Sequence, residues 1–125
     1  MNDDKLARFA NEKYINLKTY RKSGTPVDTP VWFAREGGTL YVYSRADAGK
    51  VKRVRNNPNV RIAPCDVRGS LKGDWVDAKA RMVDGAEAAR GQELLTKKYG
   101  WLKRFGDFFS RLRKTKQAVI AIQPV

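Results

Sequence analysis

The sequence predicts one mainly β domain over residues 1–125, built as a six-stranded antiparallel barrel with accessory helices. Six segments have the pattern of strands, short turns join most of them, and helical periodicity follows the third and the fifth. A chain of 125 residues with 42% hydrophobic residues can bury one core but is too short for two domains. A barrel this small has little interior space, so a large ligand is expected outside it or between two copies.

The first two strands are expected to form a hairpin. Residues 15–21 alternate between two faces, and residues 23–26 supply turn-forming side chains. Residues 27–35 form the second strand, which contains Pro30. Because proline donates no ladder hydrogen bond, this strand is expected at a sheet edge, at a bulge, or beside a ligand.

The remaining elements follow from the same periodicities. Further strands are expected at residues 39–44, 60–67, 75–83 and 117–123. Helices are expected at residues 2–11, over a basic segment that Pro58 ends, at residues 86–98, and at residues 101–114. The last of these is amphipathic and strongly basic. It is expected to cover the barrel or a dimer partner, with a membrane surface or nucleic acid as the alternatives.

The charge balance predicts an anionic partner. The chain has 26 Lys and Arg against 13 Asp and Glu, a formal net charge of +13. Such a charge suits nucleic acid, an acidic membrane surface or a phosphorylated small molecule, and composition alone does not choose among them.

Reactive side chains are few. The chain has no histidine, and its one cysteine, Cys65, can form neither an internal disulfide nor a metal site by itself. We therefore assign no catalytic residue and no metal ligand, and we expect Cys65 to be a small buried side chain. A lone cysteine and the absence of a signal-peptide pattern favour the cytoplasm, and no apolar run approaches the about 20 residues that span a bilayer.

The segment from Ser44 to Pro58 predicts a phosphate site. It leads from a strand into a short basic helix, where unpaired backbone N–H groups and the helix dipole favour an anion. Lys50 and Arg53 share one face of that helix and would supply full positive charge. A solvated basic face is the alternative. If Asp47 caps the helix, its carboxylate competes with the phosphate, which Ser44, Lys50 and Arg53 would then hold.

The segment from Thr29 to Phe33 offers a flat apolar surface. Pro30 and Trp32 alternate along it, flanked by backbone groups that could bond the edge of a planar heterocycle. Packing of Trp32 beneath a C-terminal helix is the simpler interpretation of this residue taken alone.

Together these motifs resemble the pyridoxamine 5'-phosphate oxidase-like superfamily of flavin- and deazaflavin-binding split barrels, in particular its small F-420-dependent oxidoreductases. The parts of the chain that carry the resemblance are residues 19–24, 29–33, 38–42, 48–58, 60–65 and 75–81, together with Gly69. The resemblance implies a six-stranded split β-barrel of the FMN-binding type. It also implies a homodimer that holds two cofactors in grooves between its subunits.

The resemblance further implies which residues bind the cofactor. Thr29, Pro30 and Val31 would face the tricyclic ring through backbone groups, with Trp32 beside them. Ser44, Lys50, Lys52 and Arg53 would hold the phosphate. The cofactor would carry the hydride to a small unsaturated or quinone-like substrate, while the protein binds and orients it. The high positive charge favours coenzyme F-420, with its anionic polyglutamate tail, over FMN.

Two activities of this superfamily are not expected. The relatives that oxidise pyridoxamine phosphate and those that degrade haem rely on histidine, which this chain lacks. Two other functions stay open: a basic binding module for nucleic acid or anionic lipid, and a cofactor carrier without catalysis.

Overall fold

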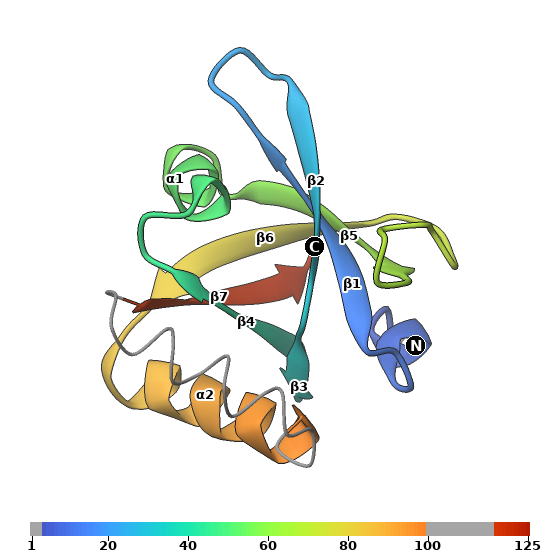
Figure 1. Ribbon diagram of the computed structural model, residues 1–125, viewed down its shortest axis with the longest axis vertical. Helices are drawn as coiled ribbons and strands as arrows, with labels where there is room; N and C mark the ends of the chain where they lie inside the picture. The colour runs from blue at the N-terminus through green and yellow to red at the C-terminus, as the bar shows by residue number, and fades with distance from the viewer. Residues whose placement is uncertain (1–3, 100–116) are drawn as a thin grey trace.

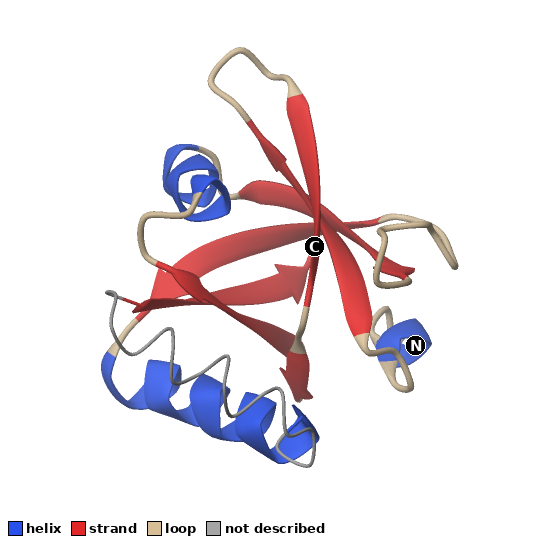
Figure 2. Cartoon of the chain, in the orientation of Figure 1, coloured by secondary structure: helices blue, strands red, loops and turns tan. Residues whose placement is uncertain are grey.

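The computed structural model describes residues 4–99 and 117–125 and shows a curled antiparallel sheet with helices at its periphery (Figures 1 and 2). The sheet has seven strands in the order β2-β1-β5-β6-β7-β4-β3. The strands are β1 (Tyr14–Tyr20), β2 (Pro26–Val31), β3 (Ala34–Glu36), β4 (Thr39–Arg45), β5 (Asn59–Cys65), β6 (Val76–Val83) and β7 (Gln117–Pro124). The helices are the 3-10 turn η1 (Ala7–Phe9), α1 (Gly49–Asn56) and α2 (Gly85–Tyr99).

The mainly β split-barrel prediction is confirmed, but the sheet has seven strands rather than six. The expected strand at residues 27–35 is interrupted at Trp32 and Phe33. Its first part, β2, pairs with β1, and its second part, β3, pairs with β4. Because β2 and β3 are the two edges of the sheet, this one segment joins the edges through the backbone instead of through a hydrogen-bonded ladder.

The edge strand β2 places its prolines where no ladder donor is needed. The hairpin closes with Arg21 N–H donating to the Thr25 carbonyl, and Gly24 adopts the positive φ of 91° that this turn requires. Bonded and non-bonded pairs alternate along an antiparallel ladder, so the register puts Pro26 and Pro30 at non-bonded positions. The expectation that the proline-containing strand lies at an edge is confirmed.

The core fills the curl of the sheet. Alternate residues of all the longer strands point inward, including Leu17, Ile62 and Ile120, which are fully buried. Val51 and Val54 of α1 pack into the same cluster. Phe9 of η1 also joins it and meets Phe33 edge-on, with ring centroids 6.1 Å apart.

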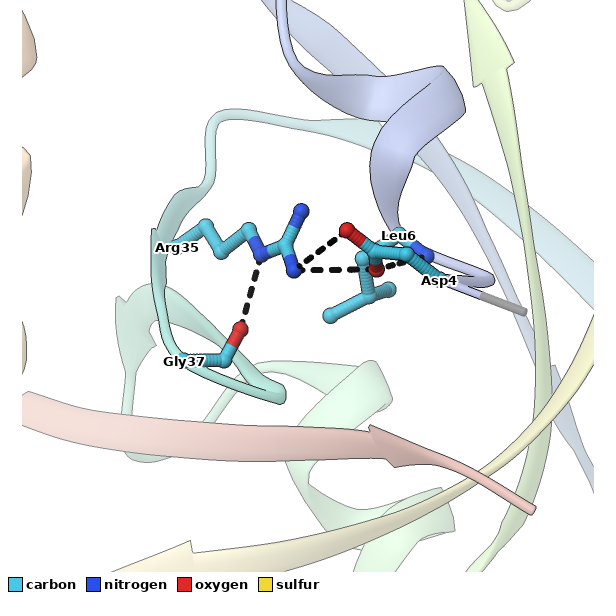
Figure 3. A network of polar contacts seen from close by, with 4 residues as sticks. All are labelled: Asp4, Leu6, Arg35 and Gly37. Atoms are coloured by element: carbon cyan, nitrogen blue, oxygen red, sulfur yellow. Dashed lines mark hydrogen bonds and ion pairs between the residues drawn. The ribbon is translucent and has the colours of Figure 1, made fainter. Parts of the chain in front are cut away.

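The N-terminal segment forms a 3-10 turn instead of the expected helix over residues 2–11. Its backbone bonds span three residues, and the Asp4 carboxylate accepts from the Leu6 N–H at 3.1 Å. The same carboxylate accepts from Arg35 at 2.9 Å, and Arg35 also donates to the Gly37 carbonyl at 2.7 Å (Figure 3). Arg35 lowers the pKa of Asp4, and this network ties the segment to the β3–β4 hairpin.

Helix α2 covers the outer face of β4 and β7, and it confirms the helix expected at residues 86–98. It approaches the sheet closely at Gly91, where a Cβ atom would lie 3.1 Å from side-chain atoms of Tyr41 and Val119. Glu87 anchors its first turn by accepting from the Tyr41 hydroxyl at 3.0 Å and from Arg81 at 2.7 Å.

Two further expectations concern the basic helix near the C-terminus and membrane-spanning segments. The basic helix expected at residues 101–114 lies outside the described residues. Among the helices that are described, none has the length and apolarity that crossing a membrane requires.

Candidate functional site

The candidate site lies where α1 meets the β1–β2 hairpin, at the end of the molecule opposite α2 (Figure 1). The helix follows β4, and its residues Val51 and Val54 are buried against the core. That packing turns the other face of α1, with Lys50 and Arg53, toward β1 and the half-buried surface beside it.

Arg53 is held by a buried hydroxyl group of β1. Its Nε donates to Thr19 Oγ1 at 2.6 Å, and Thr19 has no exposed surface. The guanidinium reaches back over the first turn of α1, because its Nη1 atom lies 2.7 Å from where a Cβ at Gly49 would stand. Glycine is therefore the residue type that leaves room for the guanidinium at the start of this helix.

The start of α1 is open to an anion. Ala48 occupies the N-cap position without a capping side chain, and no acidic residue lies in the first turn. The N–H groups of Val51 and Lys52 donate to the Ala48 carbonyl, which leaves those of Gly49 and Lys50 without an acceptor inside the helix. The possibility that Asp47 caps the helix is wrong, because Ala48 is the N-cap residue and no side chain caps the helix. The Asp47 carboxylate instead pairs with Arg45 at 3.0 Å.

Positive charge is concentrated at this helix start. Burial lowers the pKa of Lys50 from its usual value, and the nearby Arg53 lowers it further. Burial likewise lowers the pKa of Arg53, and Arg21 adds to that effect. Within residues 4–99 and 117–125, no carboxylate is ion-paired with Arg21, Lys50 or Arg53. An anion bound here would relieve the mutual repulsion of the three cations.

The other two residues expected at the phosphate have different environments. Ser44 is buried, and its hydroxyl donates to the Arg45 carbonyl at 3.2 Å. Lys52 is exposed on α1. Lys50 and Arg53 are therefore the pair that the helix and β1 bring together.

The surface expected to meet a planar ring lies next to this cluster. Val27 is the ladder partner of Thr19, and Thr29 and Val31 continue the same face of β2. Val27 and Thr29 are half-buried, Val31 is buried in the core, and Pro30 is exposed on the opposite face. By the alternation of the ladder, the backbone groups of Thr29 and Val31 point toward β1, and the Pro30 carbonyl points toward the free edge.

Trp32 lies at the break between β2 and β3 and packs against α2. Its ring stacks on Tyr99 with centroids 4.9 Å apart and planes 13° from parallel. Phe33 N–H donates to the Tyr99 hydroxyl at 3.2 Å, and that hydroxyl in turn donates to the Lys13 carbonyl at 2.7 Å or the Phe33 carbonyl at 3.0 Å. Trp32 therefore packs against the C-terminal end of α2, which agrees with the simpler interpretation of this residue.

Lys98 contacts the same break. Its Nζ donates to the Phe33 carbonyl at 2.9 Å and lies 3.5 Å from the centroid of the Phe33 ring. Burial lowers the pKa of Lys98 from its usual value to about 8. Lys98 can therefore lose its proton near physiological pH while it contacts the aromatic cluster.

We expect the free energy of unfolding to rise between pH 8 and 9 because of Lys98. In that range the unfolded chain keeps a lysine proton that the folded chain releases, so folding becomes more favourable as pH increases. The rise should be about 0.5 kcal/mol, because water screens this half-exposed ammonium group. Urea unfolding of the wild type and of Lys98→Met across this range measures it. Two curves of equal slope would contradict the expectation.

Cys65 has the environment of a structural side chain. It is buried, and burial raises the pKa of its thiol to about 11, so the nucleophilic thiolate is scarce at neutral pH. Over the described parts of the chain, no group of three or more His, Cys, Asp or Glu side chains is arranged to hold a metal ion.

Thr19, Arg21 and Gly49 lie at the candidate site, although they were not among the residues expected to bind the cofactor. Thr19 and Arg21 continue the strand face that begins with the buried residues Ile15 and Leu17. A core-facing row that turns polar at its end, beside a basic helix, is the signal that could have identified them. No comparable signal marks Gly49, because the need for glycine there comes from the position of the Arg53 guanidinium in the folded chain.

Comparisons with solved structures show the same fold at low sequence identity. A conserved hypothetical protein from Mycobacterium tuberculosis is 21% identical with a TM-score of 0.72, covering 99% of this chain and 81% of its own. The haem storage protein HutZ from Vibrio cholerae is 20% identical with a TM-score of 0.67, covering 92% and 83%. A protein described as an F420 reductase is 17% identical with a TM-score of 0.59, covering 100% and 96%.

The sequence itself gives a broader assignment. No curated protein matches the chain by sequence. The family model described as pyridoxamine 5'-phosphate oxidase, however, matches residues 2–125. With its split-barrel sheet and nearly the whole chain matched, this protein belongs to the pyridoxamine 5'-phosphate oxidase family.

Proposed function

We propose that this protein is an oxidoreductase that binds the deazaflavin coenzyme F-420, with FMN as the second candidate, and transfers hydride to a small unsaturated or quinone-like substrate. The observation that carries the proposal is the cluster of Arg53 and Lys50 at the uncapped start of α1, next to the half-buried face of β2. A flavin-type cofactor combines a phosphate and a flat ring, and this surface offers a partner for each.

The phosphate fits the chemistry of the helix start. Two backbone N–H groups lack acceptors inside the helix there, and Lys50 and Arg53 lie beside them without an ion-paired carboxylate among the described residues. Charge-assisted hydrogen bonds from such groups are about twice as strong as neutral ones. Ser44 and Lys52, from the same β4–α1 segment, remain candidates for binding the phosphate. Ser44 would have to give up the hydrogen bond that its hydroxyl donates to the Arg45 carbonyl.

The ring fits the strip along β2. Val27 and Thr29 present half-buried side chains on the face that continues from Thr19, while Val31 on the same face is buried in the core. The Pro30 carbonyl can accept a hydrogen bond at the free edge. We propose that Thr29, Pro30 and Val31 contact the ring. Trp32 follows this strip in the chain, and its ring stacks on Tyr99 of α2.

The cofactor would supply the hydride chemistry, and the chain would supply binding and orientation. That division suits a sequence without histidine. The net charge of +13 favours F-420, whose tail carries several carboxylates. The same site would serve a cofactor carrier, and substrate turnover distinguishes an enzyme from a carrier.

We further propose a cytoplasmic homodimer with the cofactor groove between subunits. The residues of the candidate site beside the β1–β2 hairpin are only partly buried in one chain, and a second subunit would enclose the exposed side of the ring. Size measurement with and without cofactor tests this arrangement.

A basic binding module for nucleic acid or anionic lipid is the competing function, and the net charge is the observation that favours it. Such a module would bind polyanions with affinity that falls steeply as salt increases. It would show no preference for a flavin ring.

We expect Lys50→Ala to weaken F-420 or FMN binding by at least about 1 kcal/mol, because it removes a charge-assisted contact with the phosphate. Fluorescence titration of the purified protein measures the change. The matched control is Lys97→Ala, which removes the same charge from an exposed position on α2. Equal affinities of the two variants would contradict the assignment of Lys50. Saturable binding to an oligonucleotide alone would favour the basic module.

A further inference from the structure

We propose that Thr19 is a positioning residue that aims Arg53 at the cofactor phosphate, and that Gly49 provides the space this arrangement needs. The inference rests on the proposed function, because it concerns how the same site selects a phosphorylated ligand. Thr19 touches no ligand in this arrangement. It acts through Arg53, whose Nε it holds at 2.6 Å.

The bond fixes the direction of the guanidinium. Thr19 is fully buried on a β-strand, so its χ1 angle is restricted and its hydroxyl oxygen is a fixed acceptor. The guanidinium group is planar, and holding Nε on one side leaves the two terminal nitrogens on the other. One of them, Nη1, lies over Gly49, where the helix has its unbonded N–H groups.

Arg53 does not reach this position through attraction to an acid. Its described charged neighbours are Arg21 and Lys50, and both repel it. A free guanidinium would turn away from these cations into water. The Thr19 hydroxyl therefore holds the guanidinium beside the other cations, and Gly49 leaves the room for it. Binding of an anion would make this position of the guanidinium electrostatically favourable.

The consequence is selectivity for the phosphate rather than for the ring. A preoriented guanidinium loses little conformational freedom on binding, so its contribution appears in the affinity for phosphorylated ligands. Ligands that share the ring but lack the phosphate should bind this protein equally well with or without the Thr19 hydroxyl.

The test compares each cofactor with its phosphate-free counterpart: FMN with riboflavin, and F-420 with its phosphate-free deazaflavin alcohol. Thr19→Val keeps the shape of the side chain and removes the acceptor. We expect about fivefold weaker binding of the phosphorylated ligands, unchanged binding of the counterparts, and recovery in Thr19→Ser. The matched control is Thr39→Val, which removes another buried strand hydroxyl that accepts a side-chain N–H, from Gln123 at 3.1 Å.

Gly49→Ala tests the same arrangement without changing a polar group. Alanine favours a helix more than glycine does, so folding should be preserved while the guanidinium is displaced. We expect the same selective loss for phosphorylated ligands. If Thr19→Val and Gly49→Ala leave the ratio of phosphorylated to phosphate-free affinity unchanged, the positioning role is wrong.

A failure of the proposed function would look different. If the wild type binds none of the four ligands, the cofactor proposal fails, and inorganic phosphate then tests the positioning role. A thermal midpoint raised by phosphate relative to chloride at equal ionic strength, with a smaller rise in Thr19→Val, would support it. Equal rises, or no rise in the wild type, would overturn it.

Discussion

Tyr99→Phe is expected to lower the free energy of unfolding by about 3 kcal/mol, because it removes one hydroxyl that serves several buried backbone groups. The Tyr99 hydroxyl accepts from the Phe33 N–H at 3.2 Å and lies within hydrogen-bond distance of the carbonyls of Lys13 and Phe33. Phenylalanine would keep the stacking on Trp32 and leave the Phe33 N–H without this acceptor where water does not reach. A buried backbone group that has no hydrogen-bond partner lowers the free energy of unfolding.

Chemical denaturation of the wild type and Tyr99→Phe measures this loss. The control is Tyr20→Phe, which removes a hydroxyl from the half-exposed end of β1 and should change stability by less than about 0.5 kcal/mol. A Tyr99→Phe protein as stable as the wild type would show that the break between β2 and β3 is held by packing alone.

Gly91→Leu should destabilise the fold by about 2 kcal/mol through overpacking between α2 and the sheet. A Cβ atom at this position would meet Tyr41 and Val119 at 3.1 Å, closer than ordinary van der Waals contact, and leucine adds three further carbon atoms. Neither neighbour can move easily, because the Tyr41 hydroxyl donates to Glu87 and Val119 is buried in β7. The helix would have to lift away from the sheet.

Thermal and urea unfolding measure the effect, with Thr96→Leu as the control on an exposed position of the same helix. Gly91→Ala is an informative intermediate. Alanine gains about 1 kcal/mol in helix propensity over glycine, and the short contacts oppose that gain. A Gly91→Leu variant with wild-type stability would mean that α2 is not held at the spacing the structure shows.

The strands were predictable from short local patterns. Buried and exposed residues alternate along β6, and β4 and β7 are short, mostly buried apolar runs. The division of residues 27–35 was not predictable in this way. Trp32 and Phe33 continue the alternation, so nothing local shows that the chain changes its ladder partner there. The residue that stabilises the break, Tyr99, is 66 positions from Phe33 in sequence, and no local pattern reports such a contact.

The candidate site was likewise predictable in part. Helical spacing alone places Lys50 and Arg53 on one face, and the structure agrees. The contact of Arg53 with Thr19 joins residues 34 positions apart in sequence, so only the folded structure reveals it. The capping role considered for Asp47 was wrong because the helix begins one residue later, with Ala48 at the N-cap position, and the Asp47 carboxylate pairs with Arg45 instead.

The two prolines of β2 have a consequence for how copies of this protein can associate. At the free edge of this strand, Asp28 alone offers a backbone N–H, because Pro26 and Pro30 have none. A strand from another molecule could donate hydrogen bonds to the carbonyls of this edge but would find only one N–H donor there, and the Asp28 carboxylate lies on the same strand. The other edge, β3, is only three residues long. Sheet extension into fibrillar aggregates is therefore disfavoured at both edges, and specific self-association must use side-chain surfaces instead.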